Sequence, residues 1–118
     1  MSAVPAKDNW PDDLRRFAAC WNEGRFFDAH ETLEPRWLAT RDRGLRGLIQ
    51  LAAAFVHLQR GNTVGARITL ERAIVRLSDE HNAPCPIDQL ALARYAQGVL
   101  ASLDTTPFGD IVTNRPRL

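Results

Sequence analysis

The sequence lacks the features that mark several large classes of protein. Among its 118 residues there are only two cysteines, Cys20 and Cys85, which stand far apart and without the close pairing of a zinc site or a redox motif. No apolar run reaches membrane-spanning length, and residues 1–10 contain no apolar segment of a secretory signal. We therefore expect two reduced thiols, no membrane partner and a cytoplasmic protein.

The chain also lacks an excess of charge of either sign. Lys and Arg total 15 against 14 Asp and Glu, and the basic residues are interleaved with acidic ones along the sequence. This balance predicts no basic patch and gives no electrostatic reason to expect a nucleic acid or an acidic membrane surface as a partner.

Common catalytic signatures are absent as well. The sequence has no nucleophile elbow, no phosphate-binding loop and no dinucleotide fingerprint. Whether the protein is an enzyme therefore stays open at this stage. With 45% apolar and 25% charged residues the chain has the composition of one globular domain rather than that of a disordered segment.

Helical periodicity dominates what is present. Apolar residues recur at spacings of three and four, and no segment alternates as a strand does. We expect an all-α, single-domain bundle of about five antiparallel helices with short connections, over residues 11–22, 25–40, 44–60, 63–80 and 87–103. The inward stripe expected for the last helix consists of Leu90, Ala93, Ala96, Val99, Leu100 and Leu103.

Three parts follow along the chain. Residues 1–10 are expected to form a flexible leader, residues 11–104 the bundle, and residues 105–118, which show no helical period, an extended C-terminal arm or tail. The apolar residues Phe108, Ile111 and Val112 favour an arm laid over the bundle. Within the second helix, Pro35 predicts a bend or a local 3₁₀ turn just before Trp37.

Ionisable residues concentrate on two helices that should be buried. The second helix carries His30, Glu31 and Glu34 on or beside its apolar stripe, and the third helix is apolar apart from Gln50 and His57. A rise of about 1.5 Å per residue, counted from the connection between these helices, sets Glu34 level with Gln50 and His30 between Gln50 and His57. We therefore expect these four polar side chains to converge in the dry interior.

Four interpretations of such a cluster stay open. The first interpretation is a structural hydrogen-bond network. The second is a metal site of His30, Glu34 and His57 for zinc, iron or manganese, although no HExxH motif is present. General acid-base catalysis by His30 and Glu34 needs an open cleft. The fourth interpretation is a pocket for a small ligand, walled by Trp37 with aromatic residues around it, and its other lining residues are Phe26, Phe27, His30, Glu31, Glu34, Gln50, His57 and Phe55.

Two blocks of the sequence resemble a known family. WNEGRFFDAHETLEPRW (residues 21–37) and RGLIQLAAAFVHLQRGNTVGA (residues 46–66) are similar to the DUF309 family of small bacterial and archaeal proteins, with the patterns FNxGxFFEAHExLExxW and GLIQLAxAxxHxxxGNxxGA. This sequence has Trp21 and Asp28 where the family often has Phe and Glu. The matching positions are Asn22, Gly24, Phe26, Phe27, Ala29, His30, Glu31, Leu33, Glu34, Trp37, Gly47, Gln50, His57, Gly61, Asn62 and Ala66. The resemblance implies a compact multihelical bundle and implies no activity.

Two functions compete on this evidence. The first is a protein that binds a small molecule or a divalent metal ion through the polar pocket. The second is a tetratricopeptide-like protein interaction module in which the polar cluster is purely structural, an idea prompted by a similar arrangement of residues around Gly24 and Gly61. Self-association through an apolar stripe on the fourth or fifth helix also stays open.

Overall fold

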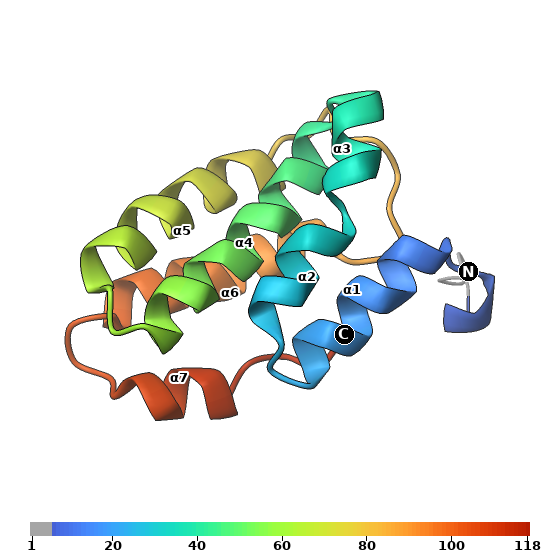
Figure 1. The fold of residues 1–118 in the computed structure, drawn as a ribbon. Coiled ribbons are helices and arrows are strands. Elements are labelled where there is room, and N and C mark those ends of the chain that lie inside the picture. The colour runs from blue at the N-terminus through green and yellow to red at the C-terminus, as the bar shows by residue number, and fades with distance from the viewer. Residues whose placement is uncertain (1–5) are drawn as a thin grey trace.

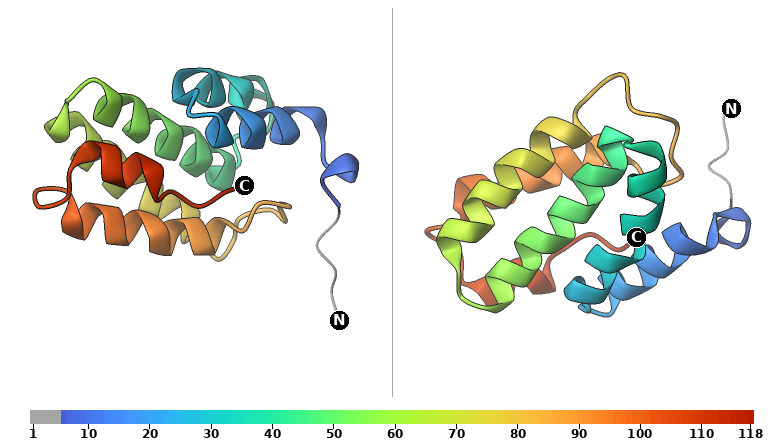
Figure 2. Two further views of the ribbon diagram at one scale, coloured as in Figure 1. Left: turned by 90° about the horizontal axis from the view of Figure 1, so that it is seen from below. Right: turned by 45° about the horizontal axis from the view of Figure 1, so that its top comes forward.

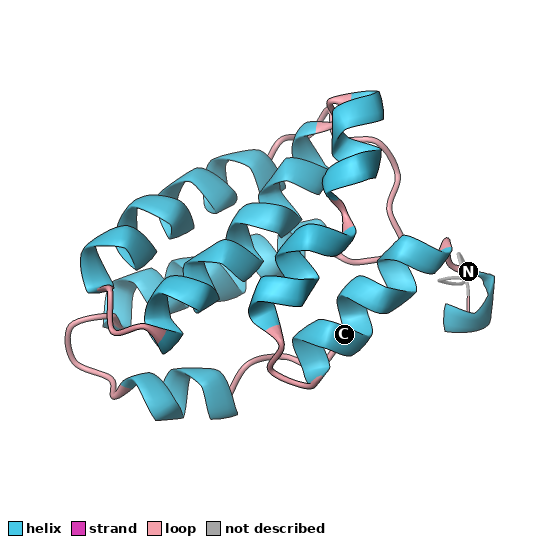
Figure 3. Ribbon diagram, in the orientation of Figure 1, coloured by secondary structure: helices cyan, strands magenta, loops and turns pink. Residues whose placement is uncertain are grey.

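Helices make up the fold in the part of the chain that the structure describes. This computed structural model describes residues 6–118, and no strand occurs among them (Figures 1 and 3). The elements are a 3₁₀ turn η1 (Lys7–Asn9) and the helices α1 (Asp12–Asn22), α2 (Phe26–Thr32), α3 (Glu34–Thr40), α4 (Arg43–Gln59), α5 (Thr63–Leu77), α6 (Gln89–Ser102) and α7 (Phe108–Thr113). The expected all-α bundle is confirmed. No helix in the described range is both long and apolar enough to cross a membrane.

The centre of the bundle is α4. It packs against α5 on one side and against α2 and α3 on the other, with α6 behind it in the view of Figure 1. Side chains around most of its circumference are buried, as its nearly continuous apolar sequence predicts. Gly47 allows the end of α5 to approach closely, since a Cβ there would lie 2.8 Å from Cγ of Leu77.

An aromatic cluster fills the core between the first helices and α4. Trp21, Phe26 and Phe55 are almost fully buried, and their ring centroids lie 4.8 to 5.2 Å apart. Such offset and edge contacts add to the free energy of burial. Both cysteines are free thiols, Cys20 buried and Cys85 partly buried.

The predicted second helix is divided into two. Leu33 ends α2, and α3 begins at Glu34 with Pro35 in its first turn, where a missing N–H costs no hydrogen bond. The interruption that Pro35 predicts is therefore present, two residues before the proline rather than just before Trp37.

Both ends of the described chain pack on the bundle. Of the expected leader, residues 1–5 lie outside the described residues, whereas Trp10 is buried at 9% exposure. The expected extended arm is partly helical, because α7 occupies residues 108–113 ahead of an extended stretch. Periodicity gave no sign of this helix, since six residues make less than two turns.

The last residues return to α1, and Figure 2 shows the C-terminus beside it. The indole Nε1 of Trp21 donates to the carbonyl of Pro116 at 2.8 Å, and the amide of Leu118 donates to Oδ1 of Asn22 at 2.8 Å. Arg115 donates to the carbonyls of Trp21 and Asn22 at 3.0 and 2.7 Å. These bonds close the chain over the aromatic cluster.

One position of the expected stripe on α6 is wrong. Leu90 is 49% exposed, while Ala93, Ala96 and Val99 are buried as expected. The inward face instead includes Gln89 and Leu92, which lie four residues before Ala93 and Ala96 and therefore on the same side of the helix.

Candidate functional site

The polar side chains line a face of the bundle instead of meeting inside it. Arg43, Arg46, Ala53 and His57 are exposed or partly exposed positions of α4, and the buried Gln50 lies in the same row at spacings of three and four. On α4 this row lies between α2 and α3 on one side and α5 on the other, and Figure 1 shows this arrangement of the helices. We call this surface the three-helix face, counting α2 and α3 as one interrupted helix beside α4 and α5. It is formed by His30, Glu34, Trp37, Arg46, Gln50, Arg72 and Arg76.

Trp37 marks the crossing of α3 and α4. The guanidinium carbon of Arg46 lies 4.5 Å from the centroid of the indole ring, and that of Arg41 lies 4.6 Å from it. Contacts of this kind are attractive because the aromatic face is electron-rich. Arg41 ends α3 in the left-handed conformation, at φ 56°.

Gln50 joins α4 to α5. Its side chain is 93% buried, and its Oε1 accepts a hydrogen bond of 3.0 Å from the guanidinium of Arg76. Burial lowers the pKa of Arg76, and the charges of Arg43, Arg46 and Arg72 lower it further. The guanidinium nevertheless stays charged at any ordinary pH. No described carboxylate lies within ion-pair distance of Arg76, so this partly buried cation has a neutral partner and positive neighbours.

His30 and Glu34 form the edge of the face. The imidazole Nε2 lies 3.2 Å from Oε1 of Glu34, across the break between α2 and α3. When Nε2–H donates to the carboxylate, Nδ1 carries the lone pair, and this atom is buried without a hydrogen-bond partner among the described residues. The pair therefore places a carboxylate and an oriented imidazole one helical turn from Trp37.

His57 lies in the last turn of α4 and bonds to the turn between α4 and α5. Its Nδ1 lies 3.1 Å from Nδ2 of Asn62, and Oδ1 of Asn62 accepts from the amide of Gly65 at 2.9 Å, which caps α5. Gly61 adopts φ +70° just before the cap. Gly65 has no room for a side chain, since a Cβ would lie 2.6 Å from Asn62 Nδ2 and 2.7 Å from His57 Nδ1.

The remaining expected site residues lie apart from this face or beneath it. Glu31 is exposed and lines a cavity between α1 and α2, together with Arg16 and Asp28. Phe26 is buried in the aromatic core. Phe27 is 50% exposed, with its ring centroid 5.8 Å from that of His30.

The predicted convergence of four polar groups in the interior is therefore wrong. His30 and Glu34 do meet, but Gln50 bonds to Arg76 and His57 to Asn62. Gln50 and His57 stand two turns apart on α4, about 10 Å, so one small site cannot include both. Among the described residues no group of three or more His, Cys, Asp or Glu could hold a metal ion, and His30, Glu34 and His57 do not form the expected metal site.

Sequence reasoning missed the arginines. The prediction that no basic patch forms is wrong, because the fold brings Arg43, Arg46, Arg72 and Arg76 close together. A signal was present in the spacing: Arg72 and Arg76 are four residues apart on one helix, where like charges repel. Alternation with acidic residues along the chain concealed it, and among the described residues only Arg43 of these four forms an ion pair, with Asp79 at 2.8 Å.

Comparison with known families gives a match to part of the chain. The model of DUF309, described as a domain of unknown function, matches residues 14–69. This match makes residues 14–69 similar to DUF309. No curated protein and no solved structure gives a significant match.

The DUF309 match, which confirms the expected resemblance, covers only part of the three-helix face. It includes His30, Glu34, Trp37 and Gln50 and ends before Arg72 and Arg76. Several of the quoted motif positions have packing roles in this structure, including Gly47 against Leu77 and the cap at the start of α5. The matched segment therefore supplies the aromatic and His–Glu side of the face together with Arg46, and the end of α5 supplies Arg72 and Arg76.

Proposed function

We propose that this protein binds a small molecule bearing a phosphate or carboxylate group on the three-helix face. The observation that carries the proposal is Arg76, a partly buried cation held by the buried amide of Gln50, close to three further arginines and without a described carboxylate partner. Gathering like charges costs free energy of folding, and residues kept at such a cost commonly serve binding.

Each part of the face has a role in this proposal. Arg46 and Arg76 come from adjacent helices, and two guanidinium groups can hold an anionic group through charge-assisted hydrogen bonds. Gln50 orients Arg76 by accepting a hydrogen bond from one of its N–H groups, which leaves the other N–H groups free to donate to a ligand. Trp37 offers an aromatic wall, and the His30–Glu34 pair supplies a carboxylate that can accept from a hydroxyl or amine of the ligand.

Calorimetric titration of the full chain at low salt tests this proposal. Inorganic phosphate and succinate are the probes, one for each anionic group, and we expect at least one to bind. Loss of a charge-assisted hydrogen bond costs about 1.5 to 3 kcal/mol, so Arg76→Gln should weaken binding roughly 10- to 100-fold. Gln50→Leu should weaken it less, since it only frees the Arg76 side chain to move.

A matched control separates the site from net charge. Arg94 is exposed on α6, behind α4 in Figure 1, and Arg94→Gln removes the same charge away from the face. We expect this variant to bind within about twofold of the parent, because exposed charges more than about 10 Å away are screened. Equal weakening by both variants, or binding of a single-stranded oligonucleotide but neither small anion, would count against the proposal.

A second candidate function rests on a separate observation. Val64, Ile68 and Val75 are exposed by 71, 44 and 60%, and their spacing puts them on one side of α5. An apolar stripe of this kind favours protein–protein interaction. Light scattering after size-exclusion chromatography tests self-association: the parent should form a dimer that Ile68→Glu dissociates, and a monomeric parent at high concentration would argue against pairing of this chain with itself.

A further inference from the structure

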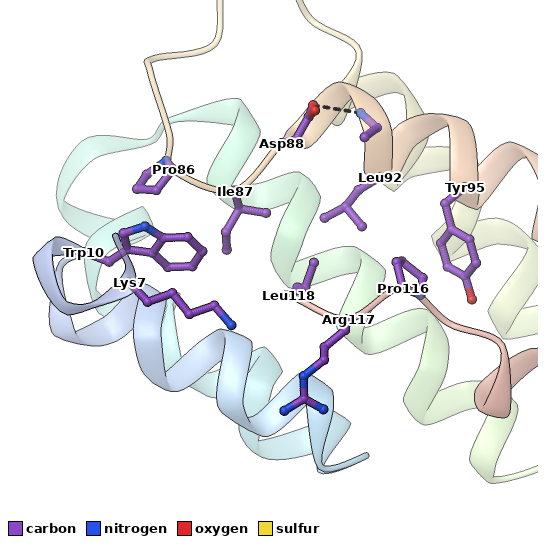
Figure 4. Close-up of a pocket in the computed structure, with 11 residues that line it drawn as sticks. Lys7, Trp10, Pro86, Ile87, Asp88, Leu92, Tyr95, Pro116, Arg117 and Leu118 are labelled. Atoms are coloured by element: carbon purple, nitrogen blue, oxygen red, sulfur yellow. Dashed lines mark hydrogen bonds between the residues drawn. The ribbon is translucent and has the colours of Figure 1, made fainter. Parts of the chain in front are cut away.

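A second site lies where both ends of the described chain meet the start of α6. A partly open cavity of about 360 Å³ is enclosed by η1, the loop before α6, the first turns of α6 and the C-terminal residues (Figure 4). This volume is within the range of cavities that hold small molecules. None of these residues belongs to the three-helix face.

The interior of this cavity is apolar. Trp10, Ile87 and Leu92 are buried at 9, 3 and 3% exposure, and their side chains face the cavity in Figure 4. The ring of Tyr95 closes one end, and its hydroxyl donates to the carbonyl of Ile111 at 3.4 Å. The phenol is thus already engaged, and burial raises the pKa of Tyr95 to about 12, so it remains neutral.

The charged residues at the rim of the cavity differ in whether their charge is already engaged within the protein. Lys7 and Arg117 lie on one side of the cavity in Figure 4, and no described carboxylate is within ion-pair distance of either. Asp88 lies across from them, but its carboxylate is engaged in capping α6 by accepting from the amide of Ala91 at 3.0 Å. An apolar chamber with two cations on one side matches a molecule that is apolar at one end and anionic at the other.

We propose that this cavity binds a small amphipathic carboxylate, with its hydrocarbon part between Trp10, Ile87 and Leu92 and its carboxylate at Lys7 and Arg117. The walls come from segments far apart in the sequence, so bound ligand would hold the C-terminal residues and η1 together. This site is independent of the anion site on the three-helix face.

Octanoate and octanamide, which differ in charge but hardly in size, are the probes. Titration of ¹⁵N-labelled full chain by NMR should shift the indole signal of Trp10, and octanoate should bind at least tenfold more tightly than octanamide. The double variant Lys7→Gln with Arg117→Gln should remove this preference and leave the affinity for octanamide unchanged. If the double variant weakens the binding of both probes equally, Lys7 and Arg117 do not recognise the carboxylate and the proposal fails.

Two further variants locate the binding. Ala91 is exposed at the cavity wall, so Ala91→Phe can fill the space without disturbing the core, and we expect it to abolish binding of both probes while circular dichroism stays unchanged. Arg76→Gln should leave octanoate binding within twofold of the parent. No shift of Trp10 in the parent, full binding by Ala91→Phe, or loss of binding in Arg76→Gln would each overturn the proposal.

Discussion

Substitution of Gly65 by alanine should destabilise this protein, although the same change stabilises most helices. A Cβ at this position would lie 2.6 Å from Nδ2 of Asn62 and 2.7 Å from Nδ1 of His57, so both side chains must move. This movement breaks the cap at the start of α5, which contributes about 1 kcal/mol to the free energy of unfolding. It also breaks the partly exposed His57–Asn62 hydrogen bond, which contributes about 0.5 to 1 kcal/mol. Replacing glycine returns up to about 1 kcal/mol of helix propensity.

The balance is a net loss of about 0.5 to 1 kcal/mol in the free energy of unfolding, or roughly 2 to 6 °C in melting temperature for a domain of this size. Scanning calorimetry and urea denaturation of Gly65→Ala against the parent measure it. The informative control is the same change in a chain that already carries His57→Ala and Asn62→Ala, where no obstructing atoms remain.

In that background Gly65→Ala should raise stability, by up to about 1 kcal/mol, because only the propensity gain is left. A reversal of sign between the two backgrounds would show that His57 supports a turn. Should Gly65→Ala stabilise the parent chain as well, the assignment of His57 to a structural role would be refuted and its place in a binding site would need to be reconsidered.

Three further outcomes follow from contacts elsewhere in the bundle. Arg115→Ala should expose the C-terminal residues to carboxypeptidase while leaving the melting temperature of the bundle nearly unchanged, because it removes the bonds to the end of α1. Burial opposes ionisation of Asp13, but the hydrogen bonds and charge of Arg36 outweigh it and hold the pKa of this carboxyl below its ordinary value. A lowered folded-state pKa means that this pair stabilises the protein above about pH 4 and that the contribution is lost as acid protonates Asp13. Asp13→Asn should therefore flatten the fall in melting temperature between about pH 5 and about pH 2. Gly47→Ala should destabilise by about 1 to 3 kcal/mol in urea denaturation, since the new methyl overlaps the side chain and approaches the backbone amide of Leu77; an unchanged midpoint would show that α5 can shift outward freely.

The helices themselves were predictable from local chemistry. Apolar spacing placed the bundle helices correctly because each amphipathic segment must bury its stripe, and Pro35 predicted an interruption because proline cannot continue a hydrogen-bonded helix. The residue composition of the site was partly predictable too: His30 and Glu34 meet because residues four apart on a helical path are neighbours wherever the helix packs.

What only the tertiary structure decided is which polar group meets which. Heights along two helices placed Gln50 level with Glu34 but could not say that Gln50 turns toward α5, since that depends on the rotation of α4 about its axis. The same rotation brings Arg43 and Arg46 of α4 close to arginines of α5, whereas Glu71, the one acidic residue between them in the sequence, is exposed. The cavity at the ends of the described chain could not be predicted from hydrophobic periodicity, because the residues that line it come together only when the whole chain folds.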